Sequence, residues 1–161
     1  MARDNYNQST RRRIMSMRKG LLVERPAALV LAAITPIFSI TGGSVILTGL
    51  LGEIEVAIAA TATTLRIGSL NTGGTPAQSY LSAVSGDIQS MAPGRMFALP
   101  AAVIGALTIS TGSSAMEFLG PEHVLTTGNL TLTGSAAPAT GTIKWSAWYV
   151  PVDEGAYMTA V

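Results

Sequence analysis

The sequence predicts a mainly β fold: a compact antiparallel β-sandwich or small barrel, preceded by an extended basic N-terminal arm. From Pro36 onward, short apolar or alternating segments are separated by clusters of Gly, Pro, Asn and Ser at fairly even spacing, which is typical of sandwiches and small barrels. These clusters supply the positive-φ positions that tight connections need. Residues 1–20 are rich in Arg, Asn, Gln and Ser, and they contain too few large apolar side chains to fold alone.

The elements follow from local pattern. Residues 21–34 are mostly apolar, and a short helix through 27–34 or an extended strand fits them. The pair Thr35-Pro36 ends any helix, because the residue before proline is pushed toward extended backbone. Strands are expected at 37–41, 45–51, 53–58, 63–68, 79–84, 95–99, 103–110, 116–119, 124–126, 129–134 and 142–150. We therefore divide the chain into an arm with an apolar linker, residues 1–35, and a β-rich oligomerising body, residues 36–161.

Two expected strands carry apolar residues without alternation, at 45–47 and 145–150. A strand that is apolar on both faces has to be covered on both. In a body of this size, we expect the second cover to be another subunit. The candidate residues for the oligomer interface or the core are Val45, Ile46, Leu47, Trp145, Trp148 and Tyr149.

The low content of charged residues also supports an oligomer. The chain is 48% hydrophobic and 12% charged, about half of the roughly 25% charge of an average domain. Such an exterior is suited to packing against copies of itself or a larger assembly. The chain has no cysteine, so disulfides and thiolate metal sites are excluded. Its longest apolar run is eight residues, far short of the roughly 20 that cross a bilayer, and no membrane contact is expected.

Positive charge is concentrated at the N-terminus. Residues 1–25 contain seven of the ten basic residues and two acidic ones, a net charge of +5, while residues 26–161 have three basic and seven acidic residues, a net charge of −4. We expect the arm to dock on acidic groups of a neighbouring protein, with Tyr6, Met15 and Met17 as apolar anchors. Nucleic acid is an alternative partner that we rank lower. The candidate docking residues are Arg11, Arg12, Arg13, Arg18 and Lys19.

Patterns of catalytic or cofactor-binding residues are not found. His123 is the single histidine and has no second His, no Cys and no acidic cluster nearby, whereas a metal site usually needs three or four ligands. Glu53 and Glu55 share one strand face, and we interpret them as solvated or paired with Arg66 or Arg95 across strands. The glycine-rich stretches lack the lysine of a phosphate-binding loop. We expect no catalytic residue, no cofactor and no metal, and therefore no enzymatic activity.

Two stretches resemble a group of small tailed-bacteriophage virion proteins. They are residues 40–54 (ITGGSVILTGLLGEI) and 141–156 (GTIKWSAWYVPVDEGA), which in that group open and close the β body, with an Ala/Thr-rich strand such as residues 62–68 between them. The resemblance implies a homotrimeric virion component that decorates or stabilises the capsid, binding the major capsid protein or another virion protein, or that forms a short head fibre. The arm is not part of the resembling pattern.

Other functions remain open within and outside the virion. A collar, tail-tip or baseplate structural protein is the alternative location. A carbohydrate-binding receptor module is a further alternative, since Trp145, Trp148 and Tyr149 could stack on sugar rings, although we favour the core or a subunit interface for these side chains.

Overall fold

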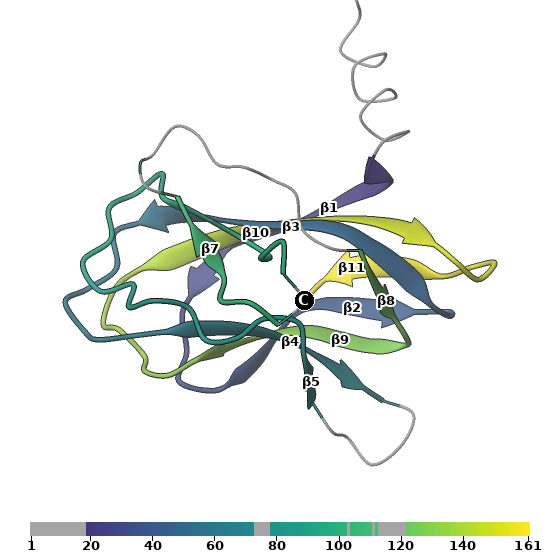
Figure 1. The fold of residues 1–161 in the computed structure, drawn as a ribbon, viewed down its shortest axis with the longest axis horizontal. Helices are drawn as coiled ribbons and strands as arrows, with labels where there is room; N and C mark the ends of the chain where they lie inside the picture. Colours follow the sequence, from purple (N-terminus) through teal and green to yellow (C-terminus); the bar gives the residue numbers. More distant parts are fainter. Residues whose placement is uncertain (1–18, 73–77, 103, 111, 113–121) are drawn as a thin grey trace, which may run out of the picture.

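The computed structural model describes residues 19–72, 78–102, 104–110, 112 and 122–161 (Figure 1). These residues form eleven strands. The strands are β1 Leu21–Leu29, β2 Ile34–Thr41, β3 Val45–Val56, β4 Leu65–Asn71, β5 Gln78–Tyr80, β6 Met96–Ala98, β7 Thr108–Ile109, β8 His123–Leu125, β9 Gly128–Gly134, β10 Thr142–Pro151 and β11 Tyr157–Ala160.

The strands form two sheets that pack face to face (Figure 1). Sheet A has the order β1-β10-β3-β6-β7, and β8 also pairs with β3. Sheet B has the order β11-β2-β9-β4-β5. Every strand pair within the two sheets is antiparallel. The predicted antiparallel β-sandwich is therefore confirmed, while residues 1–18 of the predicted arm lie outside the described residues.

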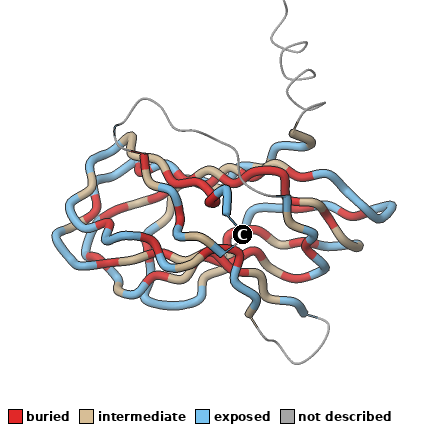
Figure 2. Tube along the Cα trace, in the orientation of Figure 1, coloured by how far each residue is buried: buried red, intermediate tan, exposed pale blue. Residues whose placement is uncertain are grey.

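The hydrophobic core lies between the two sheets, where buried positions alternate with more exposed ones along the strands (Figure 2). In β10, Trp145 is 1% exposed and points inward, and its ring stacks on that of Phe97 with 6.4 Å between centroids. Sheet B supplies Phe38 and Leu130, both fully buried. Burying a large apolar side chain contributes about 1.5–3 kcal/mol, so this shared layer holds the sheets together.

Strand β3 corrects one expectation. Residues 45–51 and 53–58 were expected as two strands, but a single strand, Val45–Val56, runs through Gly52. Gly52 is the ladder partner of Trp145, and a Cβ on it would lie 2.8 Å from the indole ring. Glycine therefore makes room here for the largest core side chain, rather than marking a turn.

Residues 21–29 and 34–35 belong to strands, and no helix forms between residues 27 and 34. The segment supplies β1, which pairs with β10 at one side of sheet A, and the start of β2 in sheet B. Pro26 lies where the β1 register shifts between Arg25 and Ala28, as expected for a residue that cannot donate to the ladder. The guanidinium of Arg25 donates to the Val161 carbonyl at 2.7 Å, which ties β1 to the end of the described chain.

The remaining expected strands differ mainly in length. Segments 79–84 and 103–110 shorten to β5 and β7, and segment 116–119 lies outside the described residues. Strand β11 was not expected. It is four residues long, and its apolar contribution to the core is a single buried methionine, Met158. So short a segment leaves little pattern in the sequence.

Candidate functional site

The predicted interface residues divide between the core and the outside of sheet A. Strand β10 alternates between buried and half-buried positions from Thr142 to Tyr149, and apolar residues, including Trp148, also occupy its outward positions. Ile46 and Trp148 are half-buried and occupy the alternating outward positions. The other four are buried between the sheets, with exposed fractions of 0% for Val45, 0% for Leu47, 1% for Trp145 and 6% for Tyr149.

Around the two outward residues lies a group of apolar side chains from four strands. In the ladder, Leu22 of β1 is opposite Trp148 of β10, and Val150 of β10 is opposite Ile46 of β3, which is opposite Val124 of β8. Val124 is 68% exposed and Leu22 52%. We call this group the apolar face; its members are Leu22, Ile46, Leu51, Val124, Trp148 and Val150.

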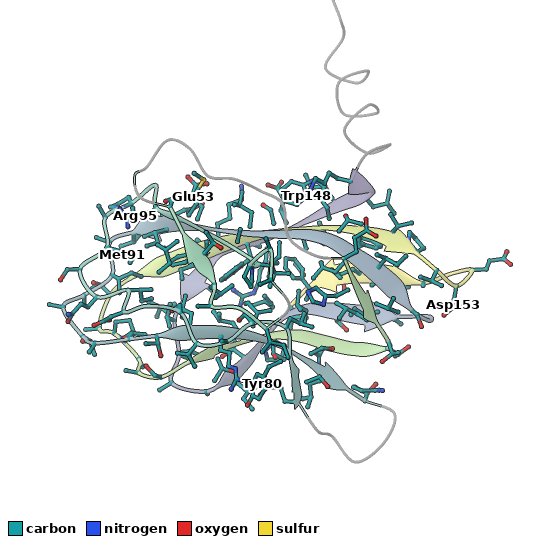
Figure 3. All side chains as sticks on the ribbon, viewed as in Figure 1. Glu53, Tyr80, Met91, Arg95, Trp148 and Asp153 are labelled. Carbon is teal, nitrogen blue, oxygen red and sulfur yellow. The ribbon has the colours of Figure 1, made fainter. Side chains whose placement is uncertain are left out.

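Beside the apolar face, the same side of sheet A becomes acidic. Lys144 is opposite Glu53 in the ladder, and its Nζ lies 3.1 Å from Oε1 of Glu24 on β1. The hydrogen bond and the charge of Glu24, followed by the charges of Glu55 and Glu53, raise the pKa of Lys144 above its ordinary value. We call Glu24, Glu53 and Glu55 the acidic strip; all three are exposed. Figure 3 shows Glu53 and Trp148 on the same side of the sandwich.

The predicted solvation of Glu53 and Glu55 thus agrees with their exposure, and Lys144 is one cation near them. Arg66, one of the two partners considered from sequence, belongs to β4 in sheet B. Its guanidinium lies 3.2 Å from the centroid of the Tyr80 ring, and its Nε donates to the Ser82 carbonyl at 3.1 Å. Arg95, the other partner considered, directly precedes Met96 of β6, which is opposite Glu53 in the ladder, and Figure 3 shows Arg95 near Glu53.

The first described residues cross the outer side of sheet A. The Thr48 hydroxyl of β3 donates to the carbonyl of Lys19, although β10 lies between β1 and β3 in the sheet. Gly20 adopts φ +87°, and a Cβ there would overlap the Tyr149 carbonyl. The chain therefore passes directly over β10, and Figure 1 shows it beginning above sheet A. We call Lys19 and Gly20 the arm root.

Of the five predicted docking residues, Lys19 alone belongs to the described part of the chain. Arg11, Arg12, Arg13 and Arg18 lie outside it. The structure thus places the root of the arm on the same side of sheet A as the apolar face and the acidic strip. Sequence reasoning did not single out Leu22, Leu51 or Val124, and it included Val150 only within the stretch 145–150. Their outward positions depend on strand register, which one sequence does not reveal.

The outer side of sheet B is different in character. Its central positions carry hydroxyl and amide groups: Ser39 of β2, Thr131 and Thr133 of β9, and Gln78 of β5. Nε2 of Gln78 donates to Oγ1 of Thr131 at 2.8 Å, and that hydroxyl donates to the Gly68 carbonyl at 3.0 Å. Thr131 is fully buried beneath the Gln78 side chain. Gln78 Nε2 and the Thr131 hydroxyl are thus paired within the subunit, while Gln78 Oε1 is buried without a hydrogen-bond partner among the described residues.

Residues with potential chemistry are scattered. His123 is half-buried on β8, its Nε2 has no hydrogen-bond partner among the described residues, and burial lowers its pKa. The Asp87 carboxylate accepts backbone N–H groups of Thr63 and Gln89 at 2.9 and 3.0 Å, which fixes a turn. Within the described residues, no three His, Cys, Asp or Glu side chains gather as metal ligands would. Nor does that part of the chain contain a helix long and apolar enough to span a membrane.

The outer side of sheet A is therefore the candidate site: an apolar face, an acidic strip and the arm root on one surface. Its side chains are suited to binding a macromolecular surface, because they combine contiguous apolar area with charge at its border. Comparisons with protein-family models, curated proteins and solved structures found no significant match for this chain.

Proposed function

We propose that this chain is a non-enzymatic structural protein of a bacteriophage virion. In this proposal it forms a homo-oligomer, a trimer, that decorates or stabilises the capsid or forms a short head fibre, and its basic arm docks on a neighbouring protein. The observation that carries the proposal is the apolar face, six outward side chains from four adjacent strands in a chain with 12% charged residues. Contiguous apolar surface of this kind marks association sites.

Approximate free energies of association indicate why the arm is needed in addition to the apolar face. Fully burying one such side chain is worth about 1.5–3 kcal/mol. Three of the six are 40–68% exposed and three are half-buried, so covering all six contributes about 3–8 kcal/mol. Association costs about 4–15 kcal/mol in lost translational and rotational freedom. The apolar face alone roughly offsets this cost. Additional contacts are required, and the charged arm beside the face supplies them.

The virion assignment is further supported by the positions of the two resembling stretches. Residues 40–54 contain most of β3, and residues 141–156 contain β10, and these two strands pair along ten positions in sheet A. The resembling residues thus belong to one continuous structural unit that carries most of the apolar face. A rigid sandwich with a peripheral tether suits a protein that is present in many copies on a particle, since several weak contacts add up to strong attachment.

Two measurements test the proposal. Light scattering of the full-length protein at micromolar concentration should give three times the mass of one chain, and a stable monomer would contradict the oligomer. Quantitative mass spectrometry of purified virions that encode the chain should find it in hundreds of copies per particle. A few to a few dozen copies would indicate a collar, tail-tip or baseplate position instead, and absence from virions would refute the virion assignment.

A carbohydrate-binding module is the second candidate, because Trp148 points outward from β10 and an aromatic ring at a surface can stack on a sugar ring. In that case Trp148→Ala would abolish binding on a glycan array while leaving the melting temperature within a few degrees of the parent protein. Unchanged binding, or no binding by the parent protein, would exclude this function.

A further inference from the structure

We propose that the neighbour on which the arm docks is a second copy of this chain. Residues 1–18 of one subunit bind across the outer side of sheet A of an adjacent subunit, with arginines against the acidic strip and apolar arm side chains against the apolar face. This inference rests on the proposed homo-oligomer and names the partner of its arm.

Charge complementarity is the first reason. Residues 1–18 contain five arginines and one aspartate, a net charge of +4. The acidic strip has three exposed carboxylates with Lys144 among them, a net charge of −2. Arginine pairs well with carboxylates, because its planar group presents several donors at once. One surface of the subunit thus carries both an acidic target and the start of a basic segment, which makes it complementary to another copy of itself.

Geometry is the second reason. The arm root lies over β10 on the outer side of sheet A, so a subunit that packs near the apolar face also meets its neighbour's arm at its point of origin. A chain of 18 residues reaches at most about 60 Å when extended. From Ile46 to Glu55, β3 spans about 30 Å. The arm is therefore long enough to cover the whole outer side of sheet A on an adjacent subunit.

The order of residues gives a third reason. Arg11, Arg12 and Arg13 are followed by the apolar side chains of Ile14 and Met15. Along the outward side of β3, Glu55 and Glu53 are followed by Leu51 and then Ile46. Both segments change from charged to apolar over a few residues. An arm laid along this strand can match its arginines to the carboxylates and its apolar side chains to the apolar face together.

The competing arrangement is an arm that folds back over its own subunit. It would cover the apolar face from within and so oppose the association that the proposed function requires. In the adjacent-subunit arrangement, the arm instead adds charged contacts to the apolar contacts between subunits. The two arrangements differ in which chains are joined, which crosslinking detects directly.

The absence of cysteine makes the experiment selective. One full-length protein carries Arg13→Cys, and a second, differently tagged one carries Glu53→Cys, Glu55→Cys or Leu51→Cys. The two proteins are mixed until their subunits exchange, and a short bismaleimide crosslinker is then added. We expect a product that carries both tags and has twice the mass of one chain. The matched control pairs Arg13→Cys with Thr159→Cys, an exposed residue on the outer side of sheet B, and should give no such product.

Two results would overturn the inference and leave the oligomer in place. One is an oligomer of unchanged mass in which none of the three positions yields the two-tag product. The other comes from a single chain that carries Arg13→Cys together with one of the sheet A substitutions, if crosslinks form only within that chain and not between chains. A monomer by light scattering would instead refute the proposed oligomer itself, so the two failures are distinguishable.

Charge reversal provides a second measurement. Arg11→Glu/Arg12→Glu/Arg13→Glu and, separately, Glu53→Lys/Glu55→Lys should each weaken subunit association tenfold or more at low salt. An equimolar mixture of the two variants should regain part of the association, because in a mixed trimer two of the three arms then meet an opposite charge on the adjacent subunit. Glu154→Lys, at an exposed glutamate in the turn before β11, is the control and should change association less than twofold. Equal effects of Glu154→Lys and Glu53→Lys would contradict a specific role for the acidic strip.

Discussion

The outer sides of sheets A and B carry different side chains, although inward and outward residues alternate along the strands of both sheets. On sheet B the central outward positions carry hydroxyl and amide groups, with bonds from Gln78 to Thr131 and from Thr131 to the Gly68 carbonyl. Its exposed apolar residues, such as Ile34 and Tyr157, are at the first positions of β2 and β11. On sheet A the outward positions form the apolar face and the acidic strip. Polar groups that already bond within the sheet gain little from a partner, whereas exposed apolar area gains free energy when it is covered. This difference is why we propose the outer side of sheet A, rather than that of sheet B, as the associating surface.

The largest expected effect comes from placing a charge in the apolar face. Ile46→Asp introduces a carboxylate between Val150 and Val124, which would be buried without a partner when subunits associate. We expect the dissociation constant of the oligomer to rise roughly 100-fold or more, a cost of about 3 kcal/mol. Analytical ultracentrifugation over a concentration series measures it.

The same charge on sheet B is the control for this prediction. Ser39 occupies an outward position on β2 opposite Asn129, and Ser39→Asp should leave the sedimentation profile unchanged. If both substitutions dissociate the oligomer equally, or if neither does, the two outer sides do not differ in the way proposed here.

A smaller effect is expected inside sheet A, at the contact that supports the apolar face from below. In Gly52→Ala, the new Cβ would lie 2.8 Å from the Trp145 ring, which is 1% exposed and stacked on Phe97 and so has little room to move. Overpacking of this kind costs about 1–3 kcal/mol. Urea unfolding should show this loss with an unchanged slope.

Gly86→Ala is the matched substitution, because the nearest atom to a Cβ there is 3.8 Å away on Ile109. We expect its unfolding free energy to stay within about 0.5 kcal/mol of the parent protein. Equal losses at the two glycines would mean that the close approach of Gly52 to the indole does not constrain β3.

The fold class could be predicted because turn residues mark the connections and apolar segments mark the core strands. The position of the candidate site on the outer side of sheet A could not be predicted. Outward Trp148 and Val150 are as apolar as inward Trp145 and Tyr149, so composition alone does not separate an interface from a core. In addition, Gly52 and Pro26 look like breaks in a sequence, whereas here one faces a tryptophan and the other lies at a register shift. Tertiary contacts outweigh local preferences at both positions.

On sheet B, removal of the internal polar network should cost stability and leave association unchanged. Gln78→Ala removes the donor to Thr131 and exposes that buried hydroxyl. A hydrogen bond of this type contributes about 1 kcal/mol, and we expect the unfolding free energy to fall by about that amount. The dissociation constant should change less than twofold. A large change in the dissociation constant would show that sheet B also takes part in association.

The smallest expected effect is a pH dependence that originates beneath the apolar face. His123 lies next to Val124 in β8, and burial lowers its pKa in the folded protein. Below about pH 6.5, the ordinary pKa of histidine, the unfolded chain binds a proton more readily than the folded one. The contribution of neutral His123 to stability is therefore complete above this pH and is lost as the pH falls through it.

Carboxylates elsewhere in the protein also titrate in acid. Comparison with the His123→Gln variant isolates the contribution of His123, because the variant keeps those carboxylates. We expect the unfolding free energy of the parent protein to fall more than that of the variant between pH 7.5 and 5.5, and the difference to be constant above pH 7.5. Urea unfolding at each pH measures both proteins. Strand β8 pairs with β3 along Val45–Leu47 and so holds Val124 beside Ile46. Protonation of His123 should weaken this pairing, and subunit association with it, in the parent protein but not in the variant. Parallel pH curves for the two proteins would contradict a role for His123 in either effect.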